Sequence, residues 1–128
     1  MTTAVTKGIK VSVKAMYNEE YSAANKGKFV YVYQITIENT TDYTVQLLRR
    51  HWKIIDSNGI LREVEGDGVL GEQPLIGPHE SHVYSSWTDM MTDVGKMFGT
   101  YLMVRQLDGE LFHVDVPEFL LVPPFKLN

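Results

Sequence analysis

Large apolar side chains occupy every second position of residues 29–37, and this period of two constrains the fold more than any other feature of the chain. The residues on the apolar side are Phe29, Tyr31, Tyr33, Ile35 and Ile37. Because successive side chains of a strand point to opposite faces of its sheet, the pattern predicts a strand with one apolar face. Residues 9–17 alternate in the same way. We therefore expect antiparallel sheets with one buried and one solvated face.

Five further extended runs bring the expected number of strands to about seven. They cover residues 44–56, 60–65, 79–87, 101–107 and 110–116. Strands at this spacing, separated by turn residues, indicate an all-β sandwich or barrel. Only residues 88–97 leave room for helix, and there we expect a single helical turn ending near Gly95.

Two dipeptides, Asn58-Gly59 and Asp108-Gly109, favour two-residue type I′ hairpin turns. At the second turn this loop length places Met103 opposite Val114, Tyr101 opposite Val116 and Arg105 opposite Phe112. Beyond it, Pro117, Pro123 and Pro124 lack the N–H group that a ladder needs. We therefore expect residues 118–128 to run along an edge or over the surface, with residues 119–122 covering apolar surface.

The composition fits one folded domain spanning residues 1–128, since 44% of the residues are hydrophobic and 22% are charged. The net charge of −4 disfavours binding to nucleic acid, which depends on clustered lysine and arginine. The chain has no cysteine and no apolar run long enough for a membrane helix. We expect a cytoplasmic protein that does not associate with membranes.

A glycine-rich segment at residues 66–71 reads GDGVLG and matches the G-x-G-x-x-G dinucleotide pattern. In a dinucleotide site these glycines join a strand to a helix whose N-terminus holds the phosphates. Here Pro74, Gly77 and Pro78 follow closely, so no such helix can form. The segment is therefore interpreted as a loop between strands.

The chain resembles the ApaG domain family. The resemblance rests on the string GDGVLGEQP at 66–74 and on flanking residues that include Tyr31, Tyr33, Asn39, Arg50, Trp52, Pro78, Tyr84, Ser86, Gly95, Met97, Gly99, Tyr101 and Met103. Two positions depart from the family pattern, because His79 and Trp87 stand where glycine is usual. If either turn uses a positive φ, a bulky residue there is strained.

The resemblance implies an immunoglobulin-like or fibronectin type III-like β-sandwich of antiparallel strands. It also implies a protein without established catalytic activity, occurring alone in bacteria and as a partner-recognition module in some eukaryotic F-box proteins. Bacterial members are associated with diadenosine tetraphosphate metabolism and with cobalt and magnesium resistance. From this likeness we expect a non-enzymatic interaction module with no cofactor.

Two sets of residues are candidate binding sites. Exposed aromatic and methionine side chains favour a protein partner at Trp87, Met90 and Met91, in a stretch that we expect to be a loop. The alternative is a phosphorylated nucleotide, pyrophosphate or divalent cation at the glycine-rich loop, held by Gly66, Asp67, Gly68 and Gly71 with Arg49 or Arg50. A homodimer is a further expectation, because sandwiches have open sheet edges.

Other polar clusters are interpreted as solvated surface. Glu63, Glu65, Asp67 and Glu72 could offer oxygen ligands to a metal, but their order matches no calcium loop. His79 and His82 would need His51 or His113 beside them, and nothing in the sequence brings these together. The residue types of a catalytic triad occur at Ser85, Ser86, Thr88, His82, Asp89 and Asp93, without a nucleophile elbow.

Overall fold

The computed structural model describes residues 1–126, and almost all of its regular secondary structure is strand. These are β1 (Thr2–Thr6), β2 (Ile9–Tyr17), β3 (Phe29–Asn39), β4 (Val45–Asp56), β5 (Leu61–Asp67), β6 (Leu75–Ile76), β7 (Ser81–Met90), β8 (Gly95–Arg105) and β9 (Leu111–Leu121). The short 3-10 turns η1 (Ala24–Lys26) and η2 (Pro124–Lys126) complete the elements. No helix in this part of the chain is long and apolar enough to cross a membrane.

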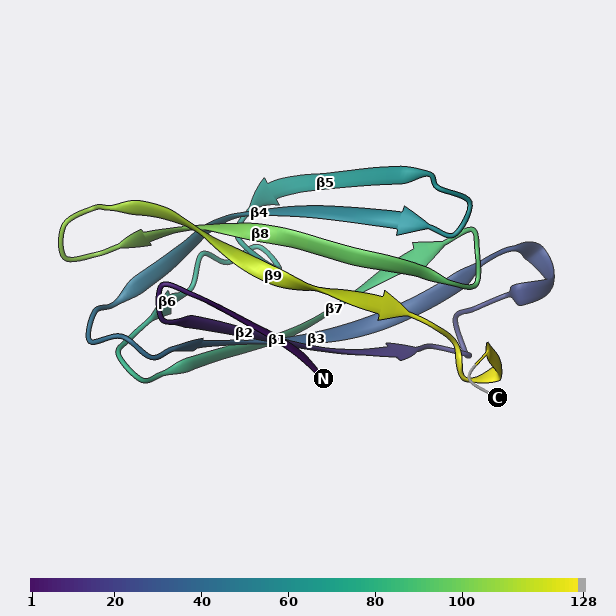
Figure 1. Ribbon diagram of the computed structural model, residues 1–128, viewed down its shortest axis with the longest axis horizontal. Helices are drawn as coiled ribbons and strands as arrows, with labels where there is room; N and C mark the ends of the chain where they lie inside the picture. Colours follow the sequence, from purple (N-terminus) through teal and green to yellow (C-terminus); the bar gives the residue numbers. More distant parts are fainter. Residues whose placement is uncertain (127–128) are drawn as a thin grey trace.

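Two antiparallel sheets pack face to face (Figure 1). One has the order β1-β2-β3-β7, and the other has the order β5-β4-β8-β9, with β6 also paired to β4. The predicted antiparallel β-sandwich is confirmed, and two stacked sheets agree with the immunoglobulin or fibronectin type III class. Within residues 1–126 there are nine strands rather than about seven.

The alternating residues of the two strongest strand patterns form one wall of the core. Val11 lies opposite Ile37 and Val13 opposite Ile35 on adjacent strands, and all four side chains are buried. The second sheet supplies the other wall, with Trp52 at its centre. The indole of Trp52 makes edge contacts with Tyr33, Tyr101 and Phe119, at centroid distances of 5.6, 6.2 and 6.1 Å. Full burial of each such side chain contributes about 1.5–3 kcal/mol to folding.

The first strand was not predicted, because it depends on an unusual hairpin turn. Thr6 pairs with Ile9 across Lys7 and Gly8, whose φ angles are 48° and 80°. Positive φ at both central residues is the type I′ geometry, for which lysine is a weak signal. The same geometry occurs at Leu70-Gly71, where φ is 50° and 77°.

The two predicted type I′ turns are hairpin turns with longer loops. At each, only the glycine has positive φ, 85° at Gly59 and 71° at Gly109. The loop at 106–109 is closed by the bond from Arg105 N to Glu110 O at 2.9 Å. The Asp108 carboxylate stabilises this longer loop by accepting a bond from the Glu110 amide at 3.1 Å. The predicted two-residue loops are therefore wrong.

The longer loop shifts the predicted register of the last hairpin by two residues. Met103 lies opposite Phe112, and Tyr101 lies opposite Val114. A shift by an even number keeps each side chain on its face. The expected apolar face is therefore present, although the expected partners are wrong.

The predicted helical turn within 88–97 is absent from the described chain, since β7 continues to Met90 and β8 begins at Gly95. Gly95 is required for packing, because a Cβ there would overlap the Met90 side chain and the Ile55 carbonyl oxygen. Residues 118–128 were expected to run along an edge or over the surface, and residues 118–121 do run along a sheet edge, as the last part of β9. Residues 127 and 128 of that segment lie outside the described residues. Strand β9 passes through Pro117 to Leu121, with a register irregularity opposite Met97–Gly99. A bulge at an edge strand accommodates the missing N–H of proline.

Candidate functional site

The outer face of the β1-β2-β3-β7 sheet carries an apolar row across three neighbouring strands. Val32 on β3 lies opposite Met16 on β2 and Trp87 on β7. The Trp87 side chain is 64% exposed, and Met16 is exposed as well. Side chains at these positions point away from the core, since their neighbours Tyr31 and Tyr33 are buried in it. The row is therefore an exposed apolar surface on a rigid sheet.

The β2–β3 connection forms a wall beside this row. Its residues Asn18, Tyr21 and Lys28, together with Val30, Val32 and Trp87, line a groove of about 430 Å³. Backbone bonds fix the connection to the sheet, with Asn18 N donating to Val30 O at 2.8 Å. The Ser22 hydroxyl adds two bonds, accepting from Val30 N at 2.9 Å and donating to Asn18 O at 2.6 Å. The groove is thus preformed.

The three residues predicted for partner binding fall into two environments. Trp87 and Met91 are exposed, at 64% and 69%, whereas Met90 is 2% exposed and packs in the core. The expected exposure of Met90 is wrong, because the segment is not a loop up to this point. Strand β7 extends to Met90, and its alternation turns Met90 inward and Trp87 outward. Trp87 also lacks the positive φ considered for it, whereas His79 has φ of 61°.

The glycine-rich segment lies at the end of β5 and turns back on itself. Gly66 and Asp67 belong to β5, opposite Arg50 and Arg49 of β4. Gly68 N donates to Leu48 O at 2.8 Å, and Val69 and Glu72 exchange backbone bonds of 2.8 and 3.0 Å. Gly71 lies at the tip of this small hairpin with φ of 77°. The predicted loop between strands is confirmed from Gly68 onward, whereas Gly66 and Asp67 extend strand β5.

The two arginines predicted to hold an anion bind the loop itself. Arg50 Nη1 donates to the carbonyl oxygens of Asp67 and Gly68, at 3.1 and 3.0 Å. Arg49 Nη1 contacts the Asp67 carboxylate at 2.6 Å. The structure therefore places all of the predicted ligand-binding residues except Gly71 beside one another, joined by the bonds of the two arginines and by the pairing of Arg50 with Gly66. An anion at this loop would compete with these internal bonds.

Behind the loop, a pocket of about 150 Å³ opens between the two sheets. It is lined by Tyr33, Arg50, Trp52, Val69, Leu70, Gly71, Tyr84 and Ser86. Burial raises the pKa of the Tyr33 and Tyr84 phenols, so both are neutral hydrogen-bonding groups near neutral pH. Many residues that carry the family resemblance meet here. Sequence reasoning missed the pocket, because it joins four separate segments of the chain.

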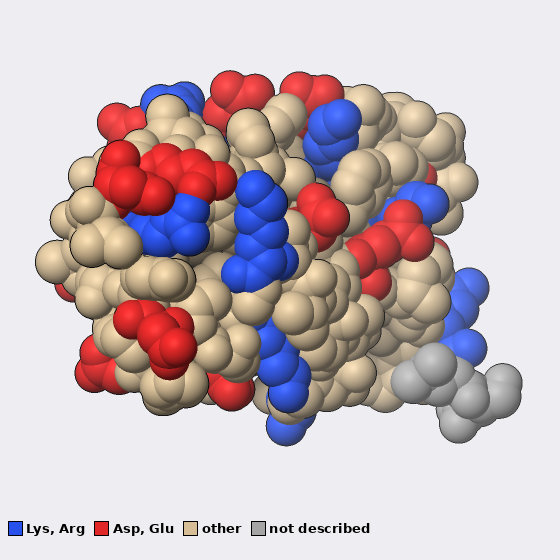
Figure 2. Space-filling model, turned by 60° about the vertical axis from the view of Figure 1, so that its left-hand side comes forward, with Lys and Arg blue, Asp and Glu red and all other residues tan. Residues whose placement is uncertain are grey.

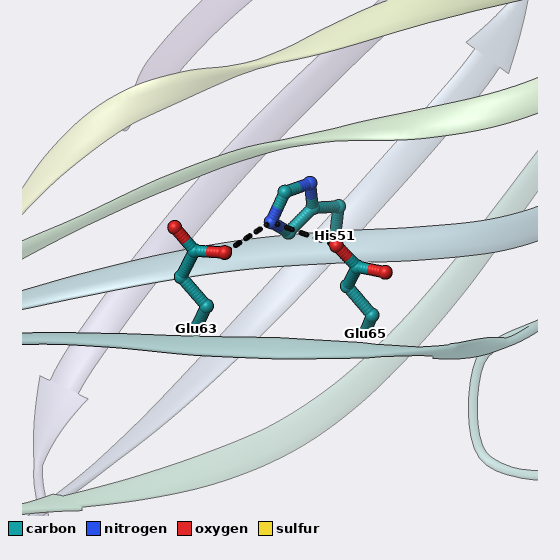
Figure 3. Close-up of side chains that lie close together, drawn as sticks. All are labelled: His51, Glu63 and Glu65. Carbon is teal, nitrogen blue, oxygen red and sulfur yellow. Dashed lines mark hydrogen bonds and ion pairs between the residues drawn. The ribbon is translucent and has the colours of Figure 1, made fainter.

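A histidine and two glutamates converge on the outer face of the other sheet (Figure 3). His51 Nε2 lies 3.3 Å from Glu63 Oε2 and 3.3 Å from Glu65 Oε1. The sequence suggested Glu63, Glu65, Asp67 and Glu72 as possible metal ligands. Of these four, Asp67 does not join the cluster and pairs with Arg49. His79 pairs with Asp42 at 3.2 Å. Cross-strand register, rather than spacing along the chain, is the signal that joins His51 to the glutamates.

The residue types of a catalytic triad are dispersed along β7 and the turn after it. His82 and Ser86 share the inner side of β7, but the buried Tyr84 lies between them in the strand. Ser85 is exposed on the other face. Asp93 lies in the following turn, where its carbonyl oxygen accepts a bond from the Tyr31 hydroxyl. These positions do not form the nucleophile–base contact of a hydrolase.

Comparison with known proteins identifies close relatives. A family model described as the ApaG domain matches residues 19–105. Protein ApaG of Brucella anthropi is 46% identical over 124 residues, covering 97% of this chain and 95% of the relative. A structural genomics crystal structure, 39% identical, superposes with a TM-score of 0.89 and covers 98% of this chain and 94% of that one. Another, from Bordetella pertussis, is also 39% identical, with a TM-score of 0.88 and coverage of 91% and 94%.

Proposed function

The chain belongs to the ApaG domain family, and on that premise we propose that it is a non-enzymatic module that binds a protein partner around Trp87. A fold of this kind hosts many functions, so the proposal depends on the surface rather than on the fold. The observation that carries it is the exposed indole of Trp87 on a regular strand, 64% accessible and beside a preformed groove.

The composition of this surface is that of an interface. Tryptophan and tyrosine are the aromatic residues most enriched at binding hot spots, and Trp87 and Tyr21 both line the groove. Asn18 and Lys28 supply polar groups at its margin, as expected of a rim around an apolar centre. Burial of the exposed indole by a partner would recover hydrophobic free energy that the isolated chain leaves unused.

Strand β7 adds a second means of contact, because it lies at the edge of its sheet. An edge strand can accept a partner's backbone in addition to side-chain contacts. One part of this edge is covered within the chain, where Arg62 donates to the carbonyl oxygen of Asp89. The stretch that carries Trp87 precedes this contact. We propose that the partner engages the Trp87 groove and this stretch together.

The charge distribution supports a protein partner rather than nucleic acid. On the face drawn in Figure 2, lysine and arginine side chains are interleaved with aspartate and glutamate side chains. The net charge of −4 also opposes a polyanion. A chain without cysteine suits a reducing compartment, and we propose the cytoplasm as its location.

A small phosphorylated ligand is the second candidate, supported by the pocket between the sheets. Arg50 lines that pocket with the hydroxyl-bearing Tyr33, Tyr84 and Ser86, and an arginine with neutral hydroxyls is suited to a phosphate group. Calorimetric titration with diadenosine tetraphosphate and pyrophosphate tests it. Binding that is lost in Arg50→Gln would favour this candidate, and absence of heat with both ligands would remove it.

Affinity capture from an extract of the source organism tests the protein-binding proposal. Wild-type protein is compared with Trp87→Ser and with Leu107→Ser, a matched control whose leucine is 75% exposed in the β8–β9 loop. We expect at least one protein that wild type and Leu107→Ser retain and Trp87→Ser loses. Equal retention by all three would contradict the proposal. Sedimentation measures whether the wild type and the same variants form dimers. If Trp87→Ser alone dissociates a dimer, the partner is a second copy of the chain.

A further inference from the structure

We infer that His51, Glu63 and Glu65 form a binding site for a divalent transition-metal ion such as zinc or cobalt. The site lies on the outer face of the β5-β4-β8-β9 sheet (Figure 3). It is therefore on the opposite sheet from the Trp87 groove and is independent of the function proposed above.

The backbone ladder places the three side chains on one surface. His51 on β4 lies directly opposite Glu65 on β5, and Glu63 precedes Glu65 by two residues on β5. Residues two apart in a strand share a face, and directly paired residues of adjacent strands have their Cβ atoms about 5 Å apart. Regular strands hold the donors, so little ordering is needed when an ion binds.

The spacing of the donor atoms fits the coordination sphere of such an ion. The ligand atoms of the three residues all lie within 4.8 Å of one another, and both carboxylate oxygens lie 3.3 Å from His51 Nε2. Zinc binds nitrogen and oxygen ligands at about 2.0–2.2 Å, which places adjacent tetrahedral ligands about 3.4 Å apart. The carboxylates need only small rotations to meet one ion.

The imidazole of His51 cannot satisfy both carboxylates by hydrogen bonding, although both glutamates are exposed to water and Lys53 lies opposite Glu63 in the ladder. An imidazole nitrogen carries at most one hydrogen, yet two carboxylates face the same nitrogen. Within residues 1–126, neither Glu63 nor Glu65 forms an ion pair with a lysine or an arginine at 4.0 Å or less. The neighbouring Arg49 pairs with Asp67 instead. A divalent cation would neutralise both carboxylates at once.

There is room for further ligands on the ion. His51 and Glu65 line a hollow of about 160 Å³ together with Arg49, Arg50, Thr100, Leu102 and His113. Three protein ligands beside an open hollow leave at least one coordination position for water or an added ligand, unlike a closed four-ligand structural zinc site. His113 borders the same hollow and does not belong to the three converging groups.

The donor set favours a particular class of ion. One imidazole nitrogen with two carboxylate oxygens suits zinc, cobalt or nickel, whereas magnesium and calcium prefer oxygen ligands alone. We therefore expect cobalt and zinc to bind more tightly than magnesium. The visible absorption of bound cobalt reports its coordination geometry directly.

The test is calorimetric titration of the tag-free full chain with zinc, cobalt and magnesium ions, together with cobalt absorption spectra. The variants are His51→Asn, Glu63→Gln and Glu65→Gln, and the control is His79→Asn, which alters a histidine paired with a single carboxylate. We expect one ion per wild-type chain, and affinity lower by at least about tenfold in each site variant and unchanged in the control. Absence of zinc and cobalt binding by the wild type would overturn the inference. Equal binding by His51→Asn, or magnesium binding as tight as zinc binding, would also overturn it. Circular dichroism confirms that each variant is folded.

Discussion

The hydroxyl groups of Tyr84 and Tyr101 are hydrogen bonded to each other in the core, joining the two sheets of the sandwich. Tyr84 belongs to β7 and Tyr101 to β8, and both side chains are buried. A buried hydroxyl needs a partner, and each supplies the other's. Tyr84 also lines the pocket that Arg50 lines, so the pair joins a wall of that pocket to the opposite sheet.

Removal of one hydroxyl leaves the other without this bond. We expect Tyr84→Phe or Tyr101→Phe to lower the free energy of unfolding by about 1–2 kcal/mol, and the double variant to cost less than the sum of the two. Urea denaturation measures all three against Tyr43→Phe, whose ring is exposed. Single variants as stable as that control would show that the bond contributes nothing.

Stability should fall in alkaline solution. Burial raises the pKa of Tyr31, Tyr33, Tyr84 and Tyr101 above the ordinary value of 10.0. Because the pKa is higher in the folded state, the unfolded chain ionises first as the pH rises. The contribution of these phenols to the free energy of unfolding is therefore complete below pH 10 and is lost above it. Each of these tyrosines lowers the free energy of unfolding by at most about 1.4 kcal/mol for each pH unit above pH 10. Urea denaturation from about pH 9 to about pH 11 measures the slope, and stability constant over that range would contradict it.

Gly99 is required by its neighbours rather than by its backbone conformation. A Cβ at this position would overlap the carbonyl oxygen of His51 and approach Trp52. Because a backbone atom cannot move aside cheaply, we expect Gly99→Ala to cost about 1–3 kcal/mol. Gly109→Ala is the comparison, since its site is open and only its φ of 71° opposes a side chain. Thermal denaturation of both variants tests this, and Gly99→Ala with wild-type stability would refute the packing role.

His79 occupies a left-handed conformation, with φ of 61°. The backbone strain expected from the sequence if His79 took a positive φ is therefore present. Trp87, for which the same strain was considered, lies in a regular strand and has no positive φ. We expect His79→Gly to raise the free energy of unfolding by about 0.5–1 kcal/mol, since glycine tolerates this conformation. The exposed contact of His79 with Asp42 contributes little in return. A fall in the denaturation midpoint would contradict this expectation.

The fold class could be predicted because alternation in β2 and β3 is both regular and long. Turn dipeptides located the hairpins but not their loop lengths, since the Asp108 side chain stabilises a longer loop than the type I′ turn. Strand β1 was missed because Lys7 takes a positive φ without a sequence signal. The continuation of β9 past Pro117 was missed because a bulge accommodates the proline.

The candidate sites were only partly predictable. The outward orientation of Trp87 follows from the alternation of β7, once that strand is known to reach Met90. The same alternation buries Met90, which a loop assignment could not show. His51 and Glu65 meet through cross-strand register, and the hairpin segment between them hides that contact in the sequence.

The most direct test of the proposed function is the affinity of the captured partner for purified variants, measured by calorimetry. Burial of Trp87 at the centre of the interface predicts that Trp87→Ser weakens binding by at least about 30-fold, corresponding to about 2 kcal/mol. Leu107→Ser should bind as tightly as the wild type. Wild-type affinity in Trp87→Ser would contradict the proposal that this surface is the binding site.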